Sequence, residues 1–337
     1  MKARALAANR ARNLFTVSYD NSTTLGSFDS RPLGLGGWTL SAHHWYDATS
    51  GTLYLGDGTR RRAQSSGNII ERLIGAAGQL EESGPPQSVA VATDGSVFVA
   101  THQTIDRYDP KTKLEGPLFR FYPEAPAAFN ACETSLSRGD GGPARSACVG
   151  DPKDLAVEPD GSLLIVDHEQ YRHYIRRLSP DGIVRRVAGV RGPNDGVTGF
   201  GCTSSPDGTP ALSAILCEID GIVVGRDSMI YFLESSNIRR IAADGTLETV
   251  LRANASVTPA PNVSQVNASL AMGPDGSIYF SAYAIVGRLH RDGHVTVAAG
   301  NGTYGHAGDG GLATAANIKI VGSLAVGSDG SLYIYDD

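Results

Sequence analysis

The chain has little that would attach it to a membrane or to a nucleic acid. Its 337 residues hold no run near the ~20 consecutive apolar residues of a membrane span, which predicts no membrane insertion within this segment. The formal net charge is −6, and no long basic run occurs, so nucleic-acid binding has no electrostatic support. Arginine pairs at 176–177, 185–186 and 239–240 recur at expected strand positions, and we interpret them as solvated strand faces.

Sequence signatures of catalysis are also missing. There is no Gly-x-Ser-x-Gly elbow, no His-Glu-x-x-His and no glycine-rich phosphate loop with lysine. The sequence therefore names no catalytic residue and no cofactor.

Cysteine is scarce, and its four copies form two close pairs, Cys132 with Cys148 and Cys202 with Cys217. Their equivalent placement predicts two local disulfides, each stabilising a loop of about 15 residues by ~3 kcal/mol in the chain-entropy model. The alternatives are four buried free thiols or, less favoured without Cys-x-x-Cys spacing, metal ligation. Disulfides would place the chain in an oxidising compartment.

Glycine and other turn residues are plentiful, and they recur within a sequence motif that is repeated five times. Each copy is an apolar run, a tight turn of the Asp-Gly type and a second apolar run, which is typical of a β-hairpin. A second hairpin follows the anchor hairpin in the complete copies, which predicts sheets of four antiparallel strands in a β-propeller. The anchoring aspartates are Asp94, Asp160, Asp227, Asp275 and Asp329.

A second motif begins 20 residues before three of these anchors. It runs over 140–147, 207–214 and 309–316, and it starts each time with Asp-Gly. The aspartate, the proline that two copies carry and the alanine-rich end predict a short helical turn with an aspartate cap.

The hairpin motif and the Asp-Gly motif together resemble the NHL repeat, most fully in Val297–Gly302 followed by Gly308–Gly311. Upstream, residues 31–47 and the following 51–59 resemble the junction between the plug and the NHL propeller of teneurins and their bacterial relatives, the RHS or YD-repeat proteins. The resemblance implies an all-β, NHL-type propeller at 51–337 after the end of a plug at 1–50. It also implies six blades, of which five anchors are visible and the last is incomplete; five blades closed by the N-terminal strands is the second choice. We expect a fragment of a larger extracellular or cell-surface protein.

A binding site is expected on the face that carries the ends of the second strands and the long connections. We expect the glycine-rich segments and both disulfides on this face, with the short Asp-Gly turns opposite. Counting seven and eight residues from the anchors gives the candidate binding residues, which are His102, Asp167, His168, Glu234, Ser235, Tyr283 and Asp336. One interpretation is a site for a divalent metal or a cationic ligand, with His102, His168, Asp167 and Glu234 as ligands. The favoured interpretation is that the carboxylates bind nearby backbone amides.

Three functions follow. The first is a non-enzymatic recognition module that presents the loop-bearing face to a protein or glycan partner. The second is a metal-dependent lyase or lactonase with ligands around the central channel. The third is a docking element beside an RHS shell that encloses a toxin.

Overall fold

The structure is a computed structural model that describes residues 45–47, 52–54, 59–62, 69–72, 86–101, 104–109, 115–120, 139–169, 172–190, 202–252, 267–319 and 321–336. The chain falls into two compact units, Ile74–Val250 and Met1–Leu73 with Leu251–Asp337, and each is described by itself. Cys132, His102 and the junction motif up to residue 44 lie outside the described residues.

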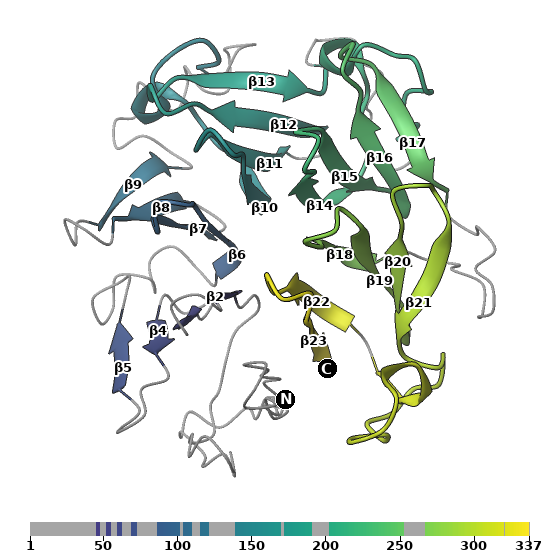
Figure 1. The fold of residues 1–337 in the computed structure, drawn as a ribbon. Coiled ribbons are helices and arrows are strands. Elements are labelled where there is room, and N and C mark those ends of the chain that lie inside the picture. Colours follow the sequence, from purple (N-terminus) through teal and green to yellow (C-terminus); the bar gives the residue numbers. More distant parts are fainter. Residues whose placement is uncertain are drawn as a thin grey trace. The chain divides into compact units, whose positions relative to one another are not determined.

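The unit over Ile74–Val250 holds three antiparallel meanders, each with its four strands in sequence order (Figure 1). The first sheet is β6 (Pro86–Val91), β7 (Val97–Thr101), β8 (Thr104–Tyr108) and β9 (Glu115–Arg120). The second is β10 (Asp151–Val157), β11 (Leu163–Glu169), β12 (Arg172–Leu178) and β13 (Val184–Ala188). The third is β14 (Ile219–Val224), β15 (Ile230–Glu234), β16 (Asn237–Ile241) and β17 (Leu247–Leu251).

The other unit holds two more four-stranded sheets and one hairpin among its described residues. One sheet is β2 (Trp45–Asp47), β3 (Thr52–Tyr54), β4 (Thr59–Arg62) and β5 (Ile69–Arg72). The next is β18 (Asn267–Met272), β19 (Ile278–Ala282), β20 (Ile285–Leu289) and β21 (Val295–Ala299). The hairpin is β22 (Val321–Val326) with β23 (Leu332–Asp336).

The repeated aspartates shape the hairpin turns, as the sequence predicts. Asp160 Oδ1 accepts the N–H of Ser162 at 2.8 Å, and Gly161 adopts a φ of +87°, which glycine reaches without a steric cost. The same side-chain bond closes the turns at Asp94, Asp275 and Asp329. Aspartate therefore fixes the turn, and the apolar runs on either side become paired strands.

A β-bulge interrupts each of the inner strands β6, β10, β14, β18 and β22 at the same place in the repeat. Next to the bulge, the residue five before three of the anchors, Asp160, Asp227 and Asp329, donates its N–H to a side chain of the preceding inner strand. Ser88 Oγ accepts the N–H of Leu155 at 3.1 Å, and Ser269 Oγ accepts that of Leu324 at 2.9 Å. Neighbouring inner strands within each unit are thus tied by a side chain six residues before the anchor.

Asp154 makes the corresponding tie in the middle of the first unit. Its carboxylate accepts Ser88 Oγ at 2.7 Å and the N–H of Ile222 at 2.9 Å, so it joins β6, β10 and β14. Burial raises the pKa of Asp154 to about 6, although the bonds from Ser88 and the two backbone amides act to lower it.

The apolar core lies between consecutive sheets. Phe98, Ile105 and Ile165 are buried together between the first two sheets of Ile74–Val250. A second cluster around Phe232 and Ile222 fills the space between the second and third sheets. Val286, Val321 and Leu324 are buried in the cluster between β18–β21 and the final hairpin.

The glycine-rich segments form short 3₁₀ turns, but without the predicted aspartate cap. The turns are η1 (Ala144–Ser146), η2 (Ala211–Ser213) and η3 (Ala313–Ala315), and none has a side-chain cap. The capping prediction is wrong because Asp140 instead pairs with Arg176 at 2.7 Å. No helix among the described residues is long and apolar enough to cross a membrane.

The predicted all-β propeller class of four-stranded sheets is confirmed. The N-terminal strands form a sheet of their own, β2–β5, and do not complete the last hairpin. Strands β2 and β3 pair on either side of residue 50. The six-blade count and the boundary at residue 50 stay predictions.

Candidate binding face

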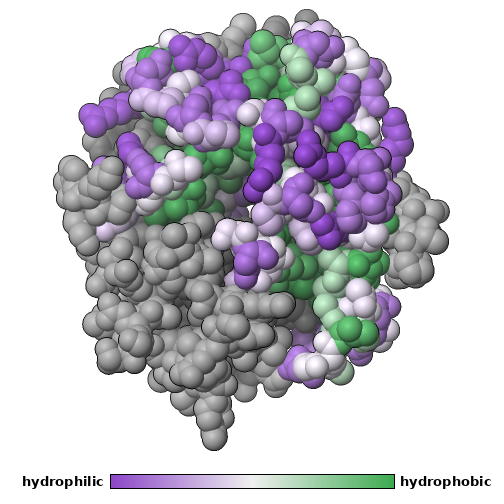
Figure 2. All heavy atoms as spheres, viewed as in Figure 1, coloured by the Kyte–Doolittle hydropathy of each residue, from purple (hydrophilic) through white to green (hydrophobic). Residues whose placement is uncertain are grey.

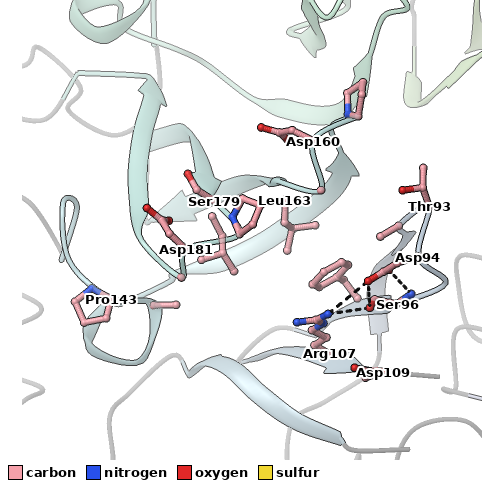
Figure 3. Close-up of a pocket in the computed structure, with 18 of the residues that line it drawn as sticks. Thr93, Asp94, Ser96, Arg107, Asp109, Pro143, Asp160, Leu163, Ser179 and Asp181 are labelled. Atoms are coloured by element: carbon pink, nitrogen blue, oxygen red, sulfur yellow. Dashed lines mark hydrogen bonds and ion pairs between the residues drawn. The ribbon is translucent and has the colours of Figure 1, made fainter. Parts of the chain in front are cut away.

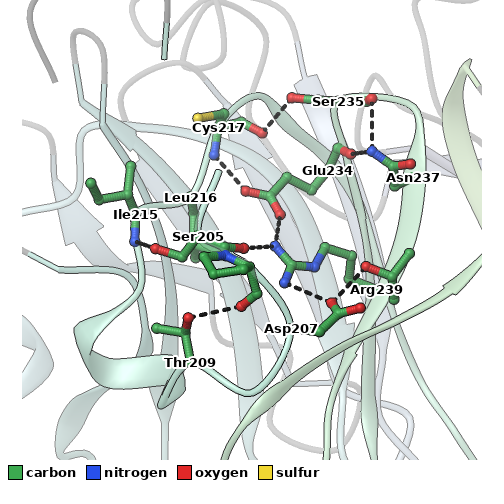
Figure 4. A network of polar contacts seen from close by, with 12 residues as sticks. Ser205, Asp207, Thr209, Ile215, Leu216, Cys217, Glu234, Ser235, Asn237 and Arg239 are labelled. Atoms are coloured by element: carbon green, nitrogen blue, oxygen red, sulfur yellow. Dashed lines mark hydrogen bonds and ion pairs between the residues drawn. The ribbon is translucent and has the colours of Figure 1, made fainter. Parts of the chain in front are cut away.

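We call the ends of the second strands, with the connections that lead into the next inner strands, the loop face. Glu234 ends β15 there and is 1% exposed. Its Oε1 accepts the N–H of Cys217 at 2.7 Å, and its Oε2 pairs with Arg239 Nη1 at 2.7 Å (Figure 4). Both carboxylate oxygens are therefore bound by the protein itself.

Arg239 extends this contact into the connection that precedes β14. Its guanidinium donates to the carbonyl of Ser205 at 2.9 Å and to Asp207 at 3.2 Å. Asp207 also accepts Thr249 Oγ1 at 2.7 Å. The connection is stapled a second time by the Cys202–Cys217 disulfide, which confirms one predicted pair.

The preceding sheet repeats the same network. Asp167, fully buried, accepts the N–H of Gly150 at 2.6 Å and pairs with Arg176 at 3.2 Å. Arg176 also donates to the carbonyl of Cys148 at 2.5 Å and pairs with Asp140. Cys148 is disulfide-bonded. A Cβ on Gly150 would come within 2.2 Å of the carbonyl oxygen of His168, so only glycine fits this approach.

These contacts decide how Asp167 and Glu234 act. They bind backbone amides, in agreement with the favoured interpretation, and they present no exposed surface to a partner. The interpretation of the arginine pairs is wrong at Arg176 and Arg239, which are 2% and 4% exposed and buried in these ion pairs. A comparison of the repeats could have indicated this pairing. In the sheet β18–β21, Ala282 stands at the position of the carboxylate and Gly287 at the position of the arginine, so both members of the ion pair are replaced together.

His168 stacks on His173 with ring centroids 4.4 Å apart. His173 Nδ1 accepts the N–H of Ile219 at 3.2 Å, which leaves the ring proton on Nε2. Burial, together with His168 and Lys153, lowers the pKa of His173 to about 3. His168 thus packs against His173, whose ring links β12 to β14.

Across the described ranges, no group of three or more His, Cys, Asp or Glu side chains is arranged to hold a metal ion. Asp167, His168 and Glu234 are therefore not brought together as such a group, and His102 lies outside the described residues. Asp336 ends β23, opposite Val321.

Ser235 and Tyr283 remain as exposed members of the predicted set. Ser235 Oγ donates to the carbonyl of Cys217 at 3.1 Å, so its hydroxyl also supports the connection. Tyr283 is 43% exposed.

A groove of about 940 Å³ lies at the Asp-Gly turns of the first two sheets of Ile74–Val250 (Figure 3). Phe98, Leu163 and Leu178 line it beside the acidic side chains Asp94, Asp160 and Asp181. Asp94 is engaged by Ser96 and lies 3.7 Å from Arg107. The bond from the Ser162 amide, partly offset by burial, lowers the pKa of Asp160.

The groove corrects one expectation about the two faces. Ala144 donates its N–H to the carbonyl of Gly182 at 2.9 Å, and Pro143 lines the groove with the turn at 179–182. The sequence predicts the glycine-rich segment and the Asp-Gly turn on opposite faces, but in the structure they lie together. The reason is that the segment pairs with the outer strand of the following sheet at Val184.

The fold and these ion-paired connections define an all-β propeller protein with stapled loops, and the comparisons agree. No protein-family model matches the chain. It is similar to mouse teneurin-3 (23% identity over 85% of the chain), human teneurin-4 (24% over 93%) and Drosophila melanogaster teneurin-m (25% over 94%). The chain is teneurin-like over most of its length, yet it spans only 11–12% of these relatives.

Solved structures agree at the level of the fold. A gluconolactonase from Xanthomonas campestris matches with a TM-score of 0.52 and 16% identity, covering 87% of this chain and 82% of that one. A calcium-binding regucalcin from Agrobacterium tumefaciens matches with a TM-score of 0.50 and 14% identity, covering 93% and 83%. These likenesses show the fold alone.

Proposed function

We propose that the chain is a non-enzymatic binding module of a large teneurin-like or RHS-like protein, at the cell surface or secreted. Its loop face contacts a protein or glycan partner. The observation that carries this proposal is the similarity to teneurins across 85–94% of the chain but only 11–12% of the relatives, because this is the relation expected of one module of a larger protein.

The geometry of the loop face supports the same proposal. The carboxylates of Asp167 and Glu234 hold the connections in place through hydrogen bonds to backbone amides and ion pairs with arginine. Rigid connections on a fixed scaffold are well suited to recognition, because little conformational entropy is lost when a partner binds. The Cys202–Cys217 disulfide fits an oxidising, extracellular compartment.

The test immobilises the purified chain and measures its binding to intact cells and to a glycan array. Thr203, exposed in the stapled connection of the loop face, is changed to Arg, and Ala243, exposed in an Asp-Gly turn, is changed to Arg as the matched control. We expect Thr203→Arg to weaken binding and Ala243→Arg to leave it unchanged. Binding that is absent, or that responds equally to both variants, argues against a loop-face recognition module.

A metal-dependent lactonase or lyase is the second candidate, because the solved structures of similar fold include a gluconolactonase and regucalcin. Its test is the metal content of the purified chain together with hydrolysis of an aldonolactone. A stoichiometric ion that is lost in His168→Ala, along with lactone hydrolysis, would favour the enzyme. Docking beside an RHS shell is the third candidate, and YD repeats in the flanking sequence would favour it.

A further inference from the structure

Tyr283 occupies a backbone conformation that a large side chain rarely adopts. It lies in the turn between β19 and β20 with a φ of +51°. A bulky residue in the left-handed region is a genuine outlier, and such outliers gather where the backbone serves a ligand or a switch.

The fold itself does not require a tyrosine at this turn. In the preceding repeat the same position is Ser235, which has a φ of +47° and uses its hydroxyl to hold the connection through Cys217. Tyr283 is instead 43% exposed, so burial does not offset the strain. The ring is held at a conformational cost in a place where solvent reaches it.

A second exposed tyrosine meets the first. Tyr304, 52% exposed, lies edge-to-face with Tyr283 at a centroid distance of 6.2 Å. The two ring planes are nearly perpendicular, at 84°. We call this arrangement the Tyr283–Tyr304 corner. Figure 2 shows hydrophobic residues at the lower right, over β21 and the segment that follows it, next to hydrophilic ones.

The loop that carries Tyr304 is held firmly in place. Asn301 Nδ2 donates to the carbonyl of Ala315 at 3.0 Å and to Asn317 Oδ1 at 2.8 Å. The N–H of Thr303 donates to Asn301 Oδ1 at 2.8 Å, and the N–H of Asn317 donates to the carbonyl of Ala307. Tyr304 is therefore presented by a closed, internally bonded loop.

We propose that the Tyr283–Tyr304 corner binds a neutral hexopyranose sugar, which deepens the proposed recognition function and rests on it. The apolar C–H face of a glucose-type or galactose-type ring stacks on a flat aromatic ring. Tyrosine is suited to this role because it combines a rigid apolar face with a hydroxyl that bonds to sugar hydroxyls, at a small entropic cost.

The dimensions of the surface favour a sugar over a protein. A stable protein interface needs on the order of 800 Å² on each partner around a buried apolar centre. Tyr283 and Tyr304 supply two half-exposed rings, and the loop that carries Tyr304 also exposes Asn301 and Thr303, which suits one or two sugar rings. A protein partner at this corner is the competing outcome of the test.

The experiment records saturation-transfer NMR of the whole chain with methyl β-D-galactopyranoside and methyl β-D-glucopyranoside. We expect transfer to the ring C–H protons with a Kd of about 1 mM for at least one of them. Tyr304→Ala and Tyr283→Gly are expected to weaken binding at least about tenfold. Tyr304→Phe keeps the stacking face and is expected to retain binding within about threefold.

The controls separate loss of the site from loss of the fold. Tyr283→Gly removes the ring but suits the turn, so its melting temperature is expected to stay at or above that of the unchanged chain. Leu212→Ala removes another exposed apolar side chain, 53% exposed, in the other unit and is expected to leave sugar binding unchanged.

Three results would overturn the sugar site: no transfer to either glycoside, transfer that survives both tyrosine substitutions, or a protein partner that is lost with them while sugars do not bind. If the chain still binds cells through the loop face when neither glycoside binds, the sugar site fails and the recognition function stands. If cell and glycan-array binding are absent too, both proposals fail.

Discussion

Arg239 is the residue that keeps a buried charge of the loop face paired. Arg239→Met would leave Glu234, 1% exposed, without its cation and Asp207 without one of its donors. Removing one partner of a buried ion pair typically costs about 3–5 kcal/mol, so we expect a loss of that order in the free energy of unfolding, measured by urea denaturation. The double variant Glu234→Gln with Arg239→Met keeps an acceptor for the Cys217 N–H without the charge. It should be more stable than Arg239→Met alone; equal stability would contradict a charge-pairing role.

His173 should make stability depend on pH. Its pKa lies at about 3 in the folded chain against an ordinary 6.5, because burial and the neighbouring His168 and Lys153 disfavour the charged ring. Between these values the unfolded chain binds a proton that the folded chain does not. The contribution of His173 to the free energy of unfolding therefore falls as pH is lowered through the window from about 6.5 to 3.

The matched variant is His173→Gln, whose side-chain carbonyl can still accept the Ile219 N–H. We expect the chain with His173→Gln to lose less stability on acidification, measured by urea denaturation at a series of pH values. The exposed His306→Gln is the control. A pH profile identical to that of the unchanged chain would exclude His173 as the cause.

At the scale of elements, the tie between inner strands can be tested within one unit. Ser269→Ala removes the acceptor of the Leu324 N–H, which joins β18 to β22. An unsatisfied buried donor costs about 1–3 kcal/mol, and we expect that loss in thermal or urea unfolding. Ser331→Ala, which removes a hydroxyl from an Asp329 turn, is the control and should stay within about 0.5 kcal/mol. Equal effects of the two serines would contradict the proposed tie.

The stapled connection is the second element with a measurable role. Cys202→Ser with Cys217→Ser opens a loop with a sequence separation of 15, and the chain-entropy model gives a loss of ~3 kcal/mol. Differential scanning calorimetry should show a lower melting temperature while the β-sheet circular dichroism signal is kept. An unchanged melting temperature would show that the Glu234 and Arg239 contacts hold the connection without the disulfide.

For the whole molecule, the small net charge of −6 is the relevant property. A chain with a net negative charge and no long basic run in its sequence is expected to release few counterions on contact with polyanions. We expect it to pass through a heparin column and to leave duplex DNA unshifted at about 0.15 M salt. Retention under these conditions would reveal a basic surface formed by residues that are far apart in the sequence.

Much of the fold could be predicted from the sequence because its signals are local. An Asp-Gly turn such as Asp160-Gly161 forms through contacts within a few residues, and the apolar runs beside it then pair in a fixed register. The Cys202–Cys217 bridge was predictable for the same reason, since its two ends lie close along the chain. Five repetitions of one motif made the class of fold evident.

Only the tertiary structure decided what the buried arginines do. The sequence pattern predicts solvated strand positions for Arg176 and Arg239. Their neighbours in the sequence do not indicate that Asp140 and Asp207, each more than 30 residues away, will contact them. The meeting of Tyr283 with Tyr304, and the pairing of the glycine-rich segment with Val184, arise in the same way. Hairpins depend on short-range backbone geometry that the sequence specifies directly, whereas burial and pairing of charges depend on which distant segments pack together.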